Sequence, residues 1–224
     1  MKLALFNGPP ARDHSGMDAL FPLTLDGKRV RLEPLSHDHV DGLVAAAAGP
    51  RDTFGLTQVP DGAEAMRRYV DEALADAARG NAVPFATVDK ARGRVVGSTR
   101  FGNIEHWKWP MAPVPPLPRA PDAVEIGWTW LAVDAQRTHV NTEAKLLMID
   151  HAFDVWGIRR LTLKTDARNA RSRANIERVG CTFDGVLRAH GPAWDGGIRN
   201  TAFYSMLASE WPAARARLVA RLRA

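Results

Sequence analysis

The chain has 224 residues, 46% of them hydrophobic and 25% charged, which is the composition of a globular protein with ample chain for one core. No apolar run is long enough to span a bilayer, and the single cysteine, Cys181, excludes an intrachain disulfide. The net charge of +5 rests mainly on arginines that no aromatic stacking surface accompanies. We therefore expect a cytoplasmic protein that binds neither nucleic acid nor membranes.

The chain divides into three expected parts. Residues 1–23 form an N-terminal extension and not a signal peptide, because no small-residue cleavage site follows their short apolar patch. Residues 24–211 form the main domain, and residues 212–224 form a basic C-terminal helix.

Strand and helix patterns alternate in the first half of the domain. Period-two alternation predicts a strand over Lys28–Pro34, and helical spacing predicts helices over His37–Ala48 and Ala63–Arg79. Two antiparallel strands are expected at Pro84–Val88 and Arg94–Ile104.

A proline-rich insertion occupies residues 105–122 and reads EHWKWPMAPVPPLPRAPD. Its prolines exclude a helix or a central strand, so we expect an extended loop. Trp107 and Trp109 would form an apolar patch if they were left uncovered. A cover for a substrate pocket and a subunit contact are both compatible with this composition, and a polyproline II ligand for a partner domain is a weaker alternative.

The stretch from Glu125 to Gly180 organises the rest of the domain. It begins with the strand Val124–Val133, continues through the basic turn QRTHVN and enters the helix TEAKLLMIDHAFDVW. A cationic turn at a helix start combines unpaired backbone N–H groups, the positive end of the helix dipole and the side chain of Arg137. These features predict an anion-binding site.

A second strand and helix follow this first unit. The strand Arg160–Thr165 is expected to run parallel to the first, and Asn169 after it can cap a helix that ends at Gly180. Residues 183–190 and 199–207 are expected to close the domain as a hairpin around a DGG turn.

This succession resembles the acyl-CoA-binding core of the GNAT superfamily of N-acyltransferases, in particular its RimJ/RimL-type branch. The resemblance rests on the QRTHVN turn, LKTDARN and SRANIERVG, and extends to LDGKRVRLEPLSHDHVDGL, GCTFDGVLRAH and RNTAFYSM. It implies an α/β fold with a mixed, mostly antiparallel twisted sheet of about seven strands. Two splayed parallel strands would lie at its centre, with helices on both faces.

The resemblance also implies a CoA thioester as the acyl donor. Acetyl-CoA is usual in the family, and succinyl-CoA serves an actinobacterial subgroup with similar RTHVNTEAK and LKTDARN segments. The residues implied for binding CoA are Leu131, Ala132, Val133, Arg137, Thr138, His139, Val140, Asn141, Thr142, Asn169 and Ser172. The turn departs from the family pattern at His139 and Asn141, where small residues are usual and let the diphosphate approach the backbone.

Two residues are candidates for proton transfer. Glu125 is the candidate general base for the amine, and the alternative is that it only orients the amine or binds a loop. Ser172 resembles the serine that protonates the departing thiolate in the RimJ/RimL-type branch, and the alternative is a hydroxyl bonded within its own helix turn. No metal is expected, because the sequence contains no metal-binding spacing of histidine, cysteine or carboxylate residues.

The sequence thus predicts an enzyme that moves an acetyl or succinyl group from CoA to a primary amine by direct attack. The amine belongs either to a small molecule or to a protein. The resemblance and the tryptophans of the insertion favour a homodimer. A non-catalytic regulatory or scaffold protein that binds CoA is the alternative.

Overall fold

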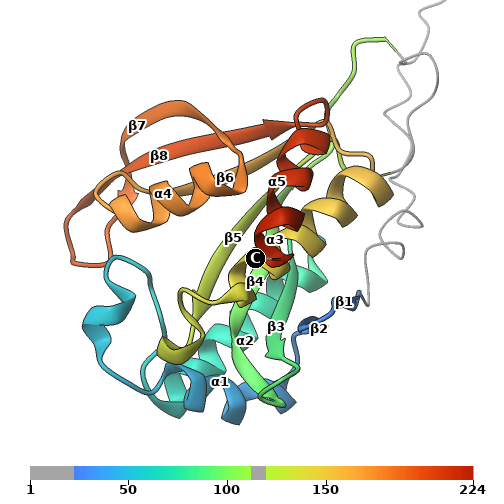
Figure 1. The fold of residues 1–224 in the computed structure, drawn as a ribbon. Helices are drawn as coiled ribbons and strands as arrows, with labels where there is room; N and C mark the ends of the chain where they lie inside the picture. Colours follow the sequence, from blue (N-terminus) through green and yellow to red (C-terminus); the bar gives the residue numbers. More distant parts are fainter. Residues whose placement is uncertain (1–22, 112–119, 224) are drawn as a thin grey trace, which may run out of the picture.

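The computed structural model describes residues 23–111 and 120–223, and its central feature is one sheet of eight strands (Figure 1). The strands are β1 (Leu25–Asp26), β2 (Val30–Pro34), β3 (Val83–Asp89), β4 (Arg94–Glu105), β5 (Ala123–Leu131), β6 (Arg160–Asp166), β7 (Thr182–Pro192) and β8 (Ile198–Leu207). Their order in the sheet is β1-β2-β3-β4-β5-β6-β8-β7. The predicted α/β fold is confirmed, and the short β1 adds one strand to the seven expected.

The described residues form five α-helices beside the sheet. They are α1 (Val40–Ala47), α2 (Gly62–Ala78), α3 (His139–Asp150), α4 (Ala170–Val179) and α5 (Trp211–Arg223). Short 3₁₀ turns lie at His37–His39, Arg51–Phe54 and Val133–Ala135, and a π-helical turn at His151–Val155 extends α3. None of the helices in the described ranges is long and apolar enough to cross a membrane.

Two neighbouring residues of β4 show that helices cover both faces of the sheet. Tyr69 of α2 donates a hydrogen bond to the Ser98 hydroxyl at 3.0 Å, whereas the Thr99 hydroxyl lies 3.8 Å from the sulfur of Met148 on α3. Successive strand residues point to opposite faces, so α2 and α3 lie on opposite sides of the sheet. Figure 1 shows α5 packed beside α3.

The strands β5 and β6 form the parallel pair at the centre of the sheet, and all other neighbouring strands are antiparallel. Their pairing runs from Ala123 opposite Arg160 to Glu125 opposite Thr162, and then stops. Both strands continue beyond this point, so they splay as the sequence predicted. The gap leaves backbone groups of β5 and β6 available to a ligand.

Local sequence signals mark the ends of α4. The Asn169 side chain accepts a hydrogen bond from the Ser172 backbone N–H at 3.0 Å, and Gly180 ends the helix with a left-handed φ of 111°. Both expectations are confirmed.

The hairpin of β7 and β8 closes one edge of the sheet, also as predicted. Arg168 lies 2.8 Å from the Asp166 carboxylate and 2.7 Å from that of Asp195, and so ties the hairpin turn to the loop before α4. Its hydrogen bond to the Asp166 carboxylate holds the pKa of that group below its usual range.

Candidate functional site

Glu125 lies where β5 and β6 part, and only 5% of it is exposed. Its Oε2 atom accepts a hydrogen bond from Asn103 Nδ2 at 2.5 Å and pairs with the Lys164 ammonium at 2.8 Å. Val124 and Ile126 flank Glu125 in the sequence, but the carboxylate itself lies among polar groups. Strand alternation turns these two residues to the other face and brings polar residues of β4 and β6 to Glu125.

The second carboxylate oxygen of Glu125, Oε1, accepts no hydrogen bond from any residue that the structure describes. A Cβ atom at position 127 would lie only 2.8 Å from this oxygen, so Gly127 keeps the space beside it clear. One oxygen of Glu125 is thus held by the protein, and the other is available to a ligand.

Lys164 was not among the residues predicted for the site. It follows the last parallel pair on β6, and its side chain is 22% exposed. Its ammonium lies 5.9 Å from the ring centroid of Phe203, its cross-strand neighbour on β8. A single basic residue within the strand LTLKT was the available sequence signal, because lysine is rare inside a central strand.

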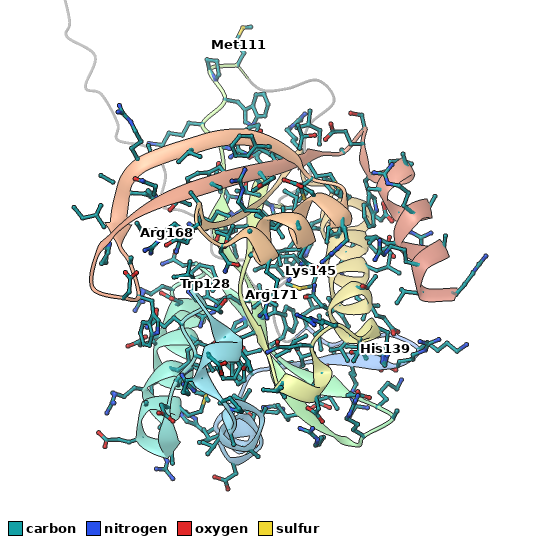
Figure 2. The ribbon with its side chains drawn as sticks, turned by 60° about the vertical axis from the view of Figure 1, so that its left-hand side comes forward. Met111, Trp128, His139, Lys145, Arg168 and Arg171 are labelled. Atoms are coloured by element: carbon teal, nitrogen blue, oxygen red, sulfur yellow. The ribbon has the colours of Figure 1, made fainter. Side chains whose placement is uncertain are left out.

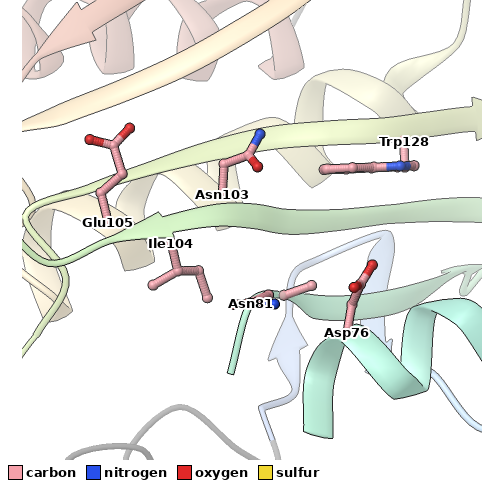
Figure 3. Close-up of a pocket in the computed structure, with 7 residues that line it drawn as sticks. Asp76, Asn81, Asn103, Ile104, Glu105 and Trp128 are labelled. Atoms are coloured by element: carbon pink, nitrogen blue, oxygen red, sulfur yellow. The ribbon is translucent and has the colours of Figure 1, made fainter. Parts of the chain in front are cut away.

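An open cavity of about 600 Å³ lies next to Asn103, the residue that binds this carboxylate, and Figure 3 shows the residues that line it. Its lining consists of Asp76, Asn81, Ala82, Asn103, Ile104, Glu105 and Trp128. Asn103 both lines the cavity and binds Glu125, so the carboxylate lies directly behind the cavity wall.

Trp128 forms the aromatic wall of this cavity through an unusual backbone conformation. Its φ angle is 51°, and the register between β4 and β5 shifts at this point. The ring lies over Gly102, where a Cβ atom would clash with it. A tryptophan in the left-handed backbone conformation raises the free energy of the folded state by about 1–3 kcal/mol, and such strain concentrates at functional sites.

The predicted anion turn leads into α3, which begins at His139 (Figure 2). Thr138 caps the helix, because its hydroxyl accepts from the Val140 N–H at 3.2 Å. Other N–H groups of the first turn have no intrahelical partner and can bind an anion. The residue in the left-handed conformation is Arg137, with a φ of 60° and an exposed side chain, and neither His139 nor Asn141 adopts a positive φ.

Of the three residues whose main chain is expected to contact the pantetheine arm, Leu131 lies in β5, and Ala132 and Val133 lead into the turn that follows. Leu131 ends β5, two residues earlier than predicted, and its carbonyl accepts from Gln136 Nε2 at 3.1 Å. The Ala132 N–H binds the Val96 carbonyl at 2.7 Å, and Val133 begins a 3₁₀ turn.

The first turn of α3 is tied to the second turn of α4. Asn141 Nδ2 donates to Asn175 Oδ1 at 3.2 Å. Asn169 caps α4 and Ser172 lies in its first turn, so both belong to the helix whose Asn175 contacts α3. Arg171 reaches from α4 to the Thr53 carbonyl at 3.0 Å.

Lys145 is a buried cation that sequence reasoning did not single out. It projects from α3 toward the sheet, with 2% exposure, and donates to the hydroxyls of Thr129 at 2.7 Å and Thr99 at 3.4 Å (Figure 2). Loss of hydration lowers the pKa of Lys145 to about 7.

Cys181 is buried, and burial raises the pKa of its thiol to about 12, which fits the apolar role expected from the sequence. In the part of the chain that the structure describes, no three His, Cys, Asp or Glu residues gather in a group that could hold a metal ion.

The family model of the acetyltransferase (GNAT) domain matches residues 29–182. This match covers more than half of the chain, so the chain belongs to the GNAT family of acetyltransferases. Acyl transfer is therefore the general class of its reaction. Comparison with curated proteins gave no match.

Solved structures of the same fold support this assignment. A GCN5-related N-acetyltransferase from Brucella melitensis is 31% identical, with a TM-score of 0.74 over 89% of this chain and 85% of that chain. An acetyltransferase from T. thermophilus is also 31% identical, with a TM-score of 0.72 over 90% and 98%. Mycobacterium smegmatis RimJ, in complex with CoA-disulfide, is 22% identical and shares the fold, with a TM-score of 0.73 over 90% and 96%.

Proposed function

We propose that this protein is an acyl-CoA-dependent N-acyltransferase that moves an acetyl group, or a succinyl group, to a primary amine by direct attack. The observation that carries the proposal is the gap between β5 and β6. It has a carboxylate with one free oxygen at its closed end and the start of α3 at its open end.

The donor's phosphates fit the start of α3. The helix dipole, the N–H groups of residues 139, 141 and 142 and the exposed Arg137 side chain all favour an anion there. The pantetheine arm would run along the main chain of Leu131, Ala132 and Val133 and reach the amide of Asn169. Its amides can pair with the free edge of a strand as a peptide would.

The acceptor amine would enter through the cavity lined by Trp128 and Asn103. Glu125 is the proposed base, with Oε1 as the oxygen that takes the proton of the amine. Ser172, at the first turn of α4, is the donor to the departing thiolate that the sequence suggests.

The acceptor class stays a small-molecule or protein amine. We propose a homodimer, because large apolar side chains are exposed on the insertion and on the hairpin of β7 and β8. A reducing, cytoplasmic setting agrees with one buried cysteine.

The test is release of free thiol from acyl-CoA. The purified protein is incubated with acetyl-CoA or succinyl-CoA, with and without a panel of amines, and thiol is measured over time. We expect release that depends on an amine and is faster with one of the two thioesters. Binding of CoA without amine-dependent release would favour the non-catalytic alternative.

A further inference from the structure

We propose that Lys164 is a catalytic residue that protonates the departing CoA thiolate, and that Glu125 then returns a proton to Lys164. This inference rests on the proposed N-acyltransferase activity. It replaces Ser172 as the donor, because Lys164 is in direct contact with the proposed base.

The position of Lys164 matches the place where the thioester must react. Parallel pairing between β5 and β6 ends at Glu125 and Thr162, two residues before Lys164 on β6. The Lys164 ammonium nevertheless crosses the widening gap to reach Glu125 Oε2 at 2.8 Å. An acyl group bound in the gap would therefore have the carboxylate on the β5 side and the ammonium on the β6 side.

Among the residues that the structure describes, Glu125 is the one that forms an ion pair with Lys164. The groups that face it are Glu125 from β5, Asn103 through that carboxylate from β4, and the Phe203 ring from β8. His190 packs on the far side of the Phe203 ring, at 5.3 Å between ring centroids. Glu125 is thus the residue that anchors the ammonium.

An ion pair of this kind has no evident value for stability alone. The Glu125 side chain is 6% exposed, and desolvating two charges costs about as much as their attraction returns. A pair of apolar side chains at this position would serve the sheet equally well. A mobile proton is a property that only the charged pair supplies.

The proposed steps balance protons and electrons. The amine nitrogen attacks the thioester carbonyl carbon and gives its proton to Glu125 Oε1. The C–S bond breaks, the sulfur takes the electron pair, and Lys164 transfers one proton to it, which leaves a neutral lysine amine. Rotation of the carboxyl group brings its proton to Nζ, and this transfer restores both the carboxylate and the ammonium.

The test replaces Lys164 by arginine. Arginine keeps the positive charge and the pairing with Glu125, but a guanidinium does not release a proton in proteins. We expect Lys164→Arg to keep its melting temperature and its CoA affinity in calorimetry and to lose about 10²-fold or more in kcat. Lys90→Met, which removes the surface pair with Asp26, is the control for ion-pair loss and should keep full turnover.

Changing the thiol of the acyl donor gives a measurement that a purely structural role of Lys164 would not affect. A thioester of an acidic aryl thiol needs no proton donor, so the deficit of Lys164→Arg should nearly vanish with it. Full turnover of Lys164→Arg with acyl-CoA would overturn the proposal, and so would an equal deficit with both donors or selective rescue of Ser172→Ala by the aryl thioester. Failure of the wild-type protein to release thiol from acyl-CoA would instead refute the proposed function itself.

Discussion

The two carboxylate oxygens of Glu125 have different surroundings. Oε2 is bound by Asn103 and Lys164, and Oε1 faces the space kept open by Gly127. This division agrees with the proposal that one oxygen anchors the side chain and the other takes the proton of the amine.

Replacing Glu125 by glutamine separates these roles, because the amide keeps the shape of the side chain and removes the base. We expect Glu125→Gln to lose about 10²-fold in kcat, with CoA affinity nearly unchanged. The deficit should shrink at high pH, where the acceptor amine is already neutral. A pH profile of kcat checks this, and equal rates for variant and wild type across pH would remove Glu125 from the proton transfer.

Sequence reasoning identified Glu125 but not its partner. Glu125 was conspicuous as a carboxylate among apolar residues of one strand. Lys164 lies 39 positions later, and nothing local indicates that the two side chains meet. Their contact depends on the register between β5 and β6, which tertiary structure sets.

Two basic residues, one just before α3 and one within it, have opposite effects. Arg137 precedes it in a left-handed conformation, with its side chain exposed beside the helix start. Lys145 lies two turns further and is buried against β5. The charge of Arg137 favours the binding of an anionic ligand. The burial of the Lys145 ammonium destabilises the folded state.

Reversing the charge of Arg137 tests the anion site. We expect Arg137→Glu to weaken CoA binding at least tenfold, because it places a carboxylate where the phosphates are proposed to lie. Isothermal calorimetry measures the change. Arg221→Glu on α5 alters the net charge equally and should leave the affinity unchanged, so equal weakening by both variants would show a nonspecific charge effect.

Replacing Lys145 by methionine should stabilise the fold at pH 7 by roughly 1–4 kcal/mol. The pKa of Lys145 falls from 10.5 to about 7 on folding, so the unfolded chain binds more protons between these values. Wild-type stability should therefore rise from pH 7 toward pH 10, and this component of the slope should disappear in Lys145→Met. The hydroxyls of Thr99 and Thr129 keep their mutual contact of 2.7 Å.

Urea unfolding at pH 7 and pH 9.5 measures this difference. Lys28→Met, at an exposed lysine, is the matched control and should retain the wild-type slope. A Lys145→Met protein that is less stable than wild type at pH 7 would show that the ammonium contributes more than its burial costs.

Helix caps and the parallel unit were predictable, because Asn169, Gly180 and the strand patterns act locally. The left-handed Trp128 was not. Its conformation follows from a register shift between β4 and β5, and no residue near Trp128 in the sequence predicts that shift.

Many of the exposed large apolar side chains in the described residues lie on the β7–β8 hairpin. Phe183, Val186, Leu187, Trp194, Ile198 and Leu207 are all exposed, and β7 forms an edge of the sheet. A long apolar edge strand needs a cover, and a second copy of the chain is the cover that we propose. We expect light scattering to give the mass of a dimer for the wild type and of a monomer for Leu187→Lys. A wild-type monomer would contradict this assembly.

In the proposed reaction, the acyl group of a CoA thioester ends on the nitrogen of an amine. Mass spectrometry of the acceptor after turnover, alongside the released thiol, tests it most directly. We predict one acyl group in amide linkage on the acceptor for each thiol released. Thiol release with free carboxylic acid and an unmodified amine would identify a thioesterase and contradict the account.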